Sequence, residues 1–376
     1  MKYMGSKRTM LLNGLGNLIA AEIVNANRFV DLFSGSAAVT WYAATRFDIE
    51  VQAIDLQHYS SVLASAVIGR ISAVDSNSIW SSWATKASKL ANAAKAPDHG
   101  TLTQKNVRAA RKWCAEKGES WILTKAYGGH YFSPSQAIWL DAFRKTIPNG
   151  TGVRDLALAS LIDAASKCAA APGHTAQPFQ PTKTAKKFLQ EAWDRDPCLR
   201  IKNALASVSA LAAKKIGKTY VQDANVAASN LEKGDLVFVD PPYSGVHYSR
   251  FYHVLETITC YQRGEVSGIG RYPSPSERPR SDYSISTKSV AALDRLLSTL
   301  STRKTRVILT FPDHRCSNGL SGDKVSELAS KYFSVTRKKV KSRFSTLGGN
   351  GNGGPDDEGR AARQNRHELI LLLSTR

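Results

Sequence analysis

The chain has 376 residues, of which 42% are hydrophobic and 22% are charged, close to globular averages, and this composition excludes global disorder. Lysine and arginine number 51 against 31 aspartates and glutamates, and the formal net charge of +20 indicates a polyanionic partner. Nucleic acid is the first candidate. An anionic membrane surface is weaker, because no apolar run approaches the roughly 18–20 residues of a spanning helix.

The N-terminal segment and the cysteines indicate a reducing compartment. The first residues are broken by Gly14 and Gly16 and lack an A-x-A cleavage pattern, so they are not typical of a signal peptide. The five cysteines are widely spread and contain no C-x-x-C pair, which predicts neither a disulfide framework nor a zinc site, and we expect no metal. A cytoplasmic protein is the simple interpretation.

The first sixty residues have the order of a nucleotide-binding α/β unit. A helix is predicted over 11–24, a strand over 28–33, a turn over 34–36, a helix over 37–44 and a strand over 50–55. The turn contains Gly35 and the second strand ends in Asp55. Strand, glycine turn, helix and strand with a terminal acid is the opening of such a fold.

A basic helical block then interrupts the α/β pattern. Residues 75–215 are expected to be mostly helical and hold 21 lysines and arginines against 10 acids. Strands are predicted again over 219–223, 235–240 and 305–311, and two more near 333–341 and 367–373 flank a glycine-rich loop. We therefore predict a catalytic domain formed by 1–74 and 216–376 with an inserted domain at 75–215, whose tryptophans are expected in its core.

The glycine turn favours a nucleoside ligand. A glycine after a strand lets the backbone approach a ligand, but the single Gly35 lacks the G-x-G-x-x-G pattern of dinucleotide sites. S-adenosylmethionine, a nucleoside with a charged amino-acid tail, fits better, and an ordinary strand–helix turn is the alternative. Asp55 can accept both ribose hydroxyls, or it can cap a helix.

The strongest signal is Asp240-Pro241-Pro242-Tyr243, which directly follows an apolar strand. Two prolines stiffen the turn and remove two backbone donors. The Asp240 carboxylate and the Pro241 carbonyl can accept both hydrogens of an amino group on an aromatic ring, while Tyr243 stacks on that ring. Acceptors aimed at the N–H bonds favour attack by the nitrogen lone pair.

These residues resemble a known family. Asp240 to Tyr243, together with the segment Phe29 to Ser36, is similar to the amino-group DNA methyltransferases, and Tyr3-Met4-Gly5-Ser6-Lys7 resembles the N-terminal motif of the Dam-like (D12 class) N6-adenine-specific DNA methyltransferases. The order of motifs, with an insert before D-P-P-Y, is also theirs. One departure is that Ala37 and Ala38 stand where further glycines are common.

The resemblance implies an α/β fold: a Rossmann-like methyltransferase sheet with a C-terminal β-hairpin, plus a helical inserted target-recognition domain. It implies site-specific transfer of a methyl group from S-adenosyl-L-methionine to adenine N6 of a flipped-out base in double-stranded DNA. Aspartate in first place suggests adenine N6 rather than cytosine N4, where serine is usual. A prokaryotic or phage-encoded origin follows, and a cognate restriction enzyme is a candidate partner.

The resemblance also assigns roles to residues. Tyr3, Lys7, Asp31 and Gly35 would lie at the methionine portion of the cofactor, with Lys7 at its carboxylate. Phe33 and Asp240 would also be cofactor-binding residues. Asp55 would bind the ribose and Asp223 the adenine amino group. Asp240, Pro241, Pro242 and Tyr243 would form the catalytic turn.

Basic segments outside these motifs are candidates for DNA contacts. We expect phosphate or base contacts from Lys186, Lys187, His247, Tyr248, Arg250, Arg271 and Arg278. A general-base role for His247 or His253 is disfavoured, since the proton can leave to water. Two alternatives stay open: a methyltransferase that acts on RNA adenine or a protein amide, and a DNA-binding subunit with inactive methylase motifs.

Overall fold

The structure, a computed structural model, describes residue 5 and residues 7–262, 264–345 and 363–376. The chain divides into two compact units. The first contains residues 57–213 and 249–279, and the second contains 4–56, 214–248 and 280–376. The first unit therefore holds the predicted insert, the helix directly before it and the segment that begins a few residues after the D-P-P-Y turn.

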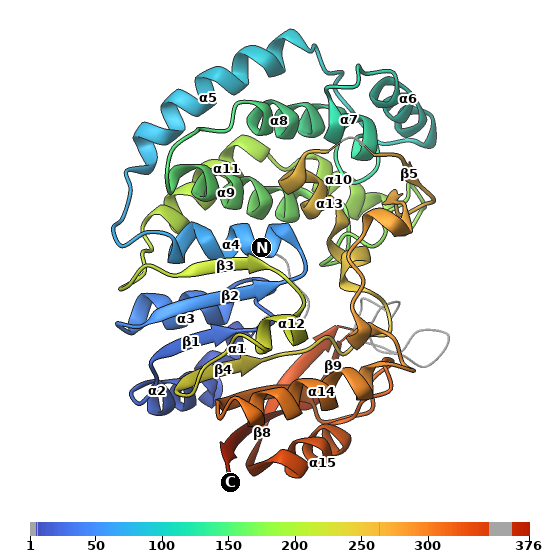
Figure 1. Ribbon diagram of the computed structural model, residues 1–376. Helices are drawn as coiled ribbons and strands as arrows, with labels where there is room; N and C mark the ends of the chain where they lie inside the picture. Colours follow the sequence, from blue (N-terminus) through green and yellow to red (C-terminus); the bar gives the residue numbers. More distant parts are fainter. Residues whose placement is uncertain (1–4, 6, 263, 346–362) are drawn as a thin grey trace. The chain divides into compact units, whose positions relative to one another are not determined.

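The second unit is built on a seven-stranded mixed sheet (Figure 1). Its strands are β1 (Arg28–Asp31), β2 (Glu50–Asp55), β3 (Lys218–Val221), β4 (Asp235–Val239), β7 (Arg306–Pro312), β8 (Phe333–Ser345) and β9 (Arg363–Thr375). Their order in the sheet is β3-β2-β1-β4-β7-β9-β8. The first five strands are parallel, whereas β9 is antiparallel to β7 and β8, so the predicted strands and the C-terminal hairpin are confirmed.

Helices cover this sheet because alternate strand residues present an apolar face. The helices of the second unit are α1 (Arg8–Met10), α2 (Gly16–Ile23), α3 (Ala38–Arg46), α12 (Ala224–Ala228), α14 (Ser289–Thr302) and α15 (Gly322–Tyr332), with a π-helical turn (Leu11–Leu15) and a 3-10 turn (Asp282–Ser284). One core joins α12, α14 and α15 to residues such as Val30, Val237 and Val307 on β1, β4 and β7. The sequence pattern of strand and helix faces is thus realised as an α/β layer structure.

The predicted single helix over 11–24 is wrong in its first half. Asn13 and Gly14 leave the helical region, with φ of −104° and 110°, and split the segment into a π-helical turn and α2. Glycine is a poor helix former and reaches positive φ at little cost, so the break occurs at Gly14.

The first unit is helical, as the composition of the insert predicts. It contains α4 (His58–Ile68), α5 (Ser76–Ala93), α6 (Gln104–Ala115), α7 (Ile122–Tyr127), α8 (Pro134–Lys145), α9 (Val153–Cys168), α10 (Lys186–Trp193), α11 (Pro197–Ser209) and nearly all of α13 (Tyr248–Cys260), with the short strands β5 (Val266–Ser267) and β6 (Tyr272–Pro273) and a 3-10 turn (Pro275–Glu277). Trp83 and Trp193 are fully buried, and the indole of Trp83 donates to the carbonyl of Phe143. These two tryptophans are core residues, as expected, whereas the other four of the insert are only partly buried: Trp80, Trp113, Trp121 and Trp139. Among the helices of the described residues, none is both long enough and apolar enough to cross a bilayer.

Candidate active site

Two turns lie at the carboxyl ends of neighbouring strands in the second unit. The turn with Gly35 follows β1, and the turn with Asp240 follows β4, which pairs with β1 in parallel. From β1 the sheet continues through β2 and β3 on one side and through β4 and β7 on the other. Ligands of open α/β sheets bind at the carboxyl edge where the strand order reverses in this way.

The glycine turn is held by two aspartates. Asp55 at the end of β2 accepts the backbone N–H of Gly35 at 2.9 Å, so the pair that the sequence singled out is in direct contact. Asp31 is buried and accepts the hydroxyl of Thr40 at 2.7 Å. Burial raises the pKa of Asp31 to about 7. The contacts of Asp31 stabilise the turn, and its predicted role at the cofactor stays a prediction.

Ala37, which stands where a further glycine is common, has a left-handed backbone. Gly35 has φ of 48° and Ala37 has φ of 59°, both in the left-handed region. That region favours glycine, since a Cβ crowds the following carbonyl. Ala37 therefore adopts here the backbone conformation for which glycine is the usual residue.

Phe33 and Asp223 lie in the same unit with structural contacts of their own. The ring of Phe33 meets that of Tyr283 edge to face at 5.2 Å. Asp223 is the N-cap of α12 and accepts the N–H of Asn225 at 2.8 Å through Oδ1. Their predicted contacts with the cofactor stay predictions, and Tyr3 lies outside the described residues.

The two carboxylate oxygens of Asp240 differ in their surroundings. Oδ1 lies 2.9 Å from the ammonium of Lys7 and accepts the hydroxyl of Thr310 at 2.8 Å. Oδ2 accepts no hydrogen bond from the described part of the chain. Burial raises the pKa of Asp240, and Lys7 opposes that rise. Oδ1 is thus held by an ion pair with Lys7 and a hydrogen bond from Thr310, and Oδ2 is available to an amino group.

The Lys7 ammonium faces a second carboxylate. It lies 3.2 Å from Oε2 of Glu368, and both side chains are about 95% buried. Burial alone would lower the pKa of Lys7, but Asp240 and Glu368 raise it above its usual value. The observed contacts of Lys7 are therefore with the D-P-P-Y aspartate and with β9, and the predicted contact with the cofactor carboxylate stays a prediction.

The rest of the D-P-P-Y turn is fixed by close packing. The amide of Asn318 donates to the carbonyl of Pro242 at 2.9 Å. Gly5 has φ of 77°, and a Cβ on it would lie 2.7 Å from the hydroxyl of Tyr243. The N-terminal motif and the D-P-P-Y motif, distant in sequence, are in contact through this glycine and through Lys7.

Sequence reasoning missed Gly5, Thr310, Asn318 and Glu368. Gly5 stood inside the N-terminal motif but received no role. Glu368 carried a signal, because it is a single acid at the start of the apolar run Leu369 to Leu373. Thr310 and Asn318 are ordinary polar residues, and nothing in their sequence context indicates that they contact the turn.

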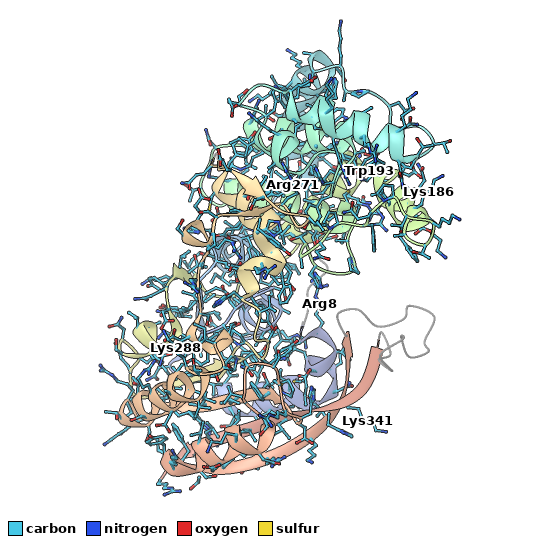
Figure 2. All side chains as sticks on the ribbon, turned by 90° about the vertical axis from the view of Figure 1, so that its right-hand side faces the viewer. Arg8, Lys186, Trp193, Arg271, Lys288 and Lys341 are labelled. Carbon is cyan, nitrogen blue, oxygen red and sulfur yellow. The ribbon has the colours of Figure 1, made fainter. Side chains whose placement is uncertain are left out.

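The candidate DNA-binding residues fall into two groups. Lys186 and Lys187 are exposed on α10, and Figure 2 shows Lys186 on the same helix as the buried Trp193. The guanidinium of Arg250 lies 4.5 Å from the ring centre of Tyr272, and that of Arg278 lies 5.6 Å from it. Both arginines thus flank one aromatic ring.

Three other candidates make contacts within the protein. The guanidinium of Arg271 donates to the carbonyl of Ala126 at 2.8 Å, so part of its hydrogen-bonding capacity stabilises the fold. The imidazole of His247 accepts the N–H of Ser281 at 3.4 Å, and the ring of Tyr248 meets that of Tyr243 edge to face. Their predicted contacts with DNA stay predictions.

His253 is a buried core residue of the first unit. Its ring packs among the rings of Tyr127, Tyr131 and Tyr272 at 5.0–5.9 Å. Burial lowers the pKa of His253 to about 4, so it is neutral at pH 7. Its burial among three tyrosine rings gives His253 a packing role in this unit.

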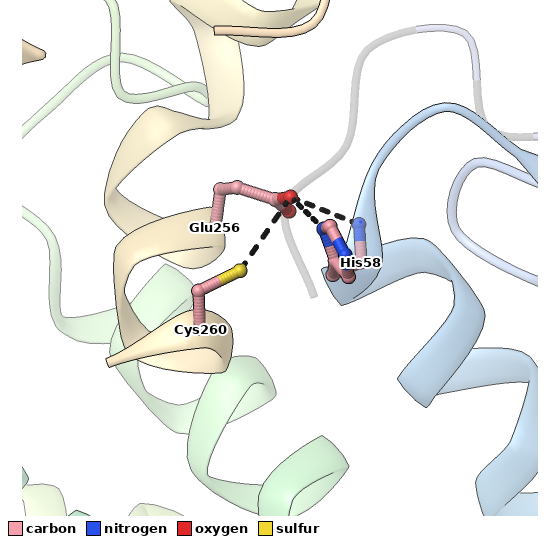
Figure 3. Close-up of side chains that lie close together, drawn as sticks. All are labelled: His58, Glu256 and Cys260. Carbon is pink, nitrogen blue, oxygen red and sulfur yellow. Dashed lines mark hydrogen bonds and ion pairs between the residues drawn. The ribbon is translucent and has the colours of Figure 1, made fainter. Parts of the chain in front are cut away.

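One histidine, one glutamate and one cysteine lie close together in the first unit (Figure 3). The Glu256 carboxylate accepts the N–H groups of His58 and Tyr59 at 3.0 Å each and contacts the His58 imidazole at 2.8 Å. Its two oxygens therefore cap the N-terminus of α4, whose own N-cap Gln57 makes no side-chain cap. This capping accounts for the cluster, with Cys260 one turn further along α13.

Comparison with known proteins agrees with this geometry. Residues 3–106 and 171–308, more than half of the chain, match the family described as D12 class N6 adenine-specific DNA methyltransferase. The match contains Lys7, the Gly35 turn, Asp55 and the D-P-P-Y turn, and it omits residues 107–170 of the helical insert and everything after residue 308.

Curated relatives are methylases. The chain is 26% identical to modification methylase LlaI of Lactococcus lactis subsp. lactis over 77% of its length and 43% of that protein. It is 28% identical to type II methyltransferase M.FokI of Planomicrobium okeanokoites over 71% of its length and 38% of that protein. It is 26% identical to type II methyltransferase M.NlaIII of Neisseria lactamica over 69% of its length and 70% of that protein. The chain thus spans less than half of the first two relatives.

The family match covers more than half of the chain and contains the Gly35 turn and the D-P-P-Y turn, which the fold brings to one edge of the sheet. The chain therefore belongs to the D12 class of N6 adenine-specific DNA methyltransferases.

Proposed function

We propose that this chain transfers the methyl group of S-adenosyl-L-methionine to N6 of an adenine in double-stranded DNA. The observation that carries the proposal is the asymmetry of Asp240. Its Oδ1 is fixed by Lys7 and Thr310, which leaves Oδ2 to accept a hydrogen bond from a substrate amino group.

The residues present fit the cofactor. Asp55 and Gly35 are in contact at the carboxyl edge of the sheet, which matches a nucleoside site with a carboxylate for the ribose hydroxyls. Asp223 at the end of the neighbouring β3 uses Oδ1 in its helix cap, and within the described residues Oδ2 accepts no hydrogen bond. Asp55 would hold the ribose, Asp223 the adenine amino group, and Phe33 an apolar flank. When bound, S-adenosylmethionine supplies an electrophilic methyl group.

The chain's own residues would bind and orient the target base. Asp240 Oδ2 and the Pro241 carbonyl would accept the two N6 hydrogens, and Tyr243 would stack on the ring. These acceptors favour the geometry in which the N6 lone pair leaves conjugation, and they stabilise the positive charge that develops on nitrogen. The N6 lone pair would form the bond to the methyl group that the cofactor supplies, with the cofactor sulfur as the leaving group, and the surplus N6 proton would leave to water.

The target base would have to leave the duplex. Both N6 hydrogens cannot be bound while one is paired to thymine, so a turn of this kind requires base flipping. The charge of +20 supports a nucleic-acid substrate, and the helical insert, with exposed Lys186 and Lys187, would contribute to target recognition. Such an enzyme acts in the cytoplasm on chromosomal or phage DNA, with a cognate restriction enzyme as a candidate partner.

Transfer of tritium from labelled S-adenosylmethionine to DNA, RNA and protein tests the proposal. We expect label in duplex DNA as N6-methyladenine and none in RNA or protein. Asp240→Asn should abolish transfer. Asp313→Asn, in partly exposed ion pairs with Arg337 and Lys339, is the matched control. Label in RNA alone would show that the substrate is RNA and not DNA. DNA binding without any transfer would instead identify an inactive DNA-binding subunit.

A further inference from the structure

Glu368 has a position that the family match does not account for. It lies on β9, opposite Pro312 of β7 and Val340 of β8, and it is followed by the buried residues Leu369 to Leu371. A carboxylate at such a position is costly unless it is paired. Among the described residues it is paired with Lys7, at 3.2 Å, the same lysine that contacts Asp240.

The charges of this cluster do not cancel. One ammonium lies between two carboxylates, so the buried group of Lys7, Asp240 and Glu368 carries one net negative charge. A pair of Lys7 and Asp240 alone would be neutral. Under the proposed function the amino nitrogen becomes positive as it is methylated, and a neutral pair would stabilise that charge poorly.

The geometry also separates two tasks. Lys7 and Thr310 both contact Oδ1 of Asp240, which orients the carboxylate. Glu368 Oε2 contacts the same ammonium at 3.2 Å, so Lys7 can orient Asp240 while the three groups together keep a negative charge. Thr310 and Glu368 both come after residue 308, where the family match ends. Thr310 lies on β7, which is next to β4 in the sheet, and Glu368 lies on β9, which is next to β7.

We propose that Glu368 is a positioning residue for methyl transfer, which holds the Lys7 ammonium and keeps the D-P-P-Y site negatively charged. This inference rests on the proposed function. If Glu368 only stabilised the fold, its removal would not change the pKa of Asp240, whereas the proposed role requires such a change. The negative charge of Glu368 raises the pKa of Asp240, and removal of that charge must lower it.

The test is Glu368→Gln, which keeps size and removes charge, compared with Glu368→Asp and with Glu327→Gln, an exposed control on α15 that pairs with Lys324. We expect kcat for DNA methylation to fall by roughly tenfold or more in Glu368→Gln, less than the roughly 10²–10³ of a directly contacting donor. KM for S-adenosylmethionine should change little. Glu368→Asp should recover part of kcat, and Glu327→Gln should match wild type.

The pH profile is the readout that a structural role would not move. Asp240 must be ionised to accept the amino hydrogens, so the acid limb of kcat includes its pKa. The neighbouring Asp31 also has a raised pKa, mainly through burial, which Glu368→Gln leaves in place. In Glu368→Gln this limb should move to lower pH, since the nearby negative charge is gone. If Glu368→Gln keeps the kcat and the acid limb of the unmodified protein, the inference about Glu368 is overturned and the proposed function still holds. If the unmodified protein transfers no methyl group, the proposed function itself is overturned.

A double-mutant cycle covers the case in which Glu368→Gln is unstable. Lys7→Met/Glu368→Gln removes the ammonium and the Glu368 charge together, and it leaves Asp240 as the one ion of the three, with the Thr310 hydroxyl still donating to it. If Glu368 acts through Lys7, the further loss of kcat caused by Glu368→Gln should nearly vanish on the Lys7→Met background. Equal losses on both backgrounds would refute the coupling.

Discussion

Gly5→Ala offers a sharp test of the contact between the N-terminal motif and the catalytic turn. The added Cβ would lie 2.7 Å from the Tyr243 hydroxyl, whereas ordinary contacts begin at 3.4 Å, so the phenol must retreat by about 0.7 Å. The backbone at φ of 77° adds strain on the order of 1–2 kcal/mol. Because a misplacement near 1 Å can cost about 10²-fold in rate, we expect kcat to fall by roughly 10- to 10²-fold.

Gly14→Ala separates the strain from the displacement. Gly14 also has positive φ, 110°, but its Cβ would meet only the flexible end of Lys338, at 3.0 Å. Both variants should lose a few degrees of Tm, and only Gly5→Ala should lose activity. The assay is methyl transfer at saturating cofactor with parallel thermal unfolding. Wild-type kcat in Gly5→Ala, or equal losses in both variants, would refute the reasoning.

Three further predictions follow from the site. Asp55→Ala should weaken S-adenosylmethionine binding by on the order of 1.5–3 kcal/mol, because a charged acceptor is removed; unchanged affinity by calorimetry would contradict the ribose assignment. Lys186→Ala/Lys187→Ala should leave cofactor binding intact and weaken the salt dependence of DNA binding. The slope of the logarithm of the binding constant against the logarithm of the salt concentration should fall by up to about 1 for each lysine that neutralises a phosphate. An unchanged slope would show that these lysines do not contact DNA. A mismatch opposite the target adenine should tighten binding, since flipping costs less; an adenine that stays paired in a competent complex would exclude the mechanism.

The local motifs and the strand pattern were readable from the sequence. Three motifs could be predicted because each depends on the backbone conformation of a few consecutive residues. They are the glycine after β1, the acid at the end of β2 and D-P-P-Y after β4. The strands and the helical insert follow from hydrophobic periodicity, which is also local. The break in the helix at Asn13 and Gly14 was not predicted, because the helical spacing of apolar residues continues across it.

Contacts between distant segments were decided only by the tertiary structure. Parallel pairing of β1 with β4 brings residue 35 to the edge that holds residue 240, although about 200 residues separate them. The pairing of β9 with β7 brings Glu368 to Lys7, more than 350 residues away in sequence, and no local pattern encodes that distance. Spacing and residue type therefore identified the groups that can do the chemistry. Which oxygen of Asp240 is occupied, and what charge surrounds it, depends on side chains that only the folded sheet brings together.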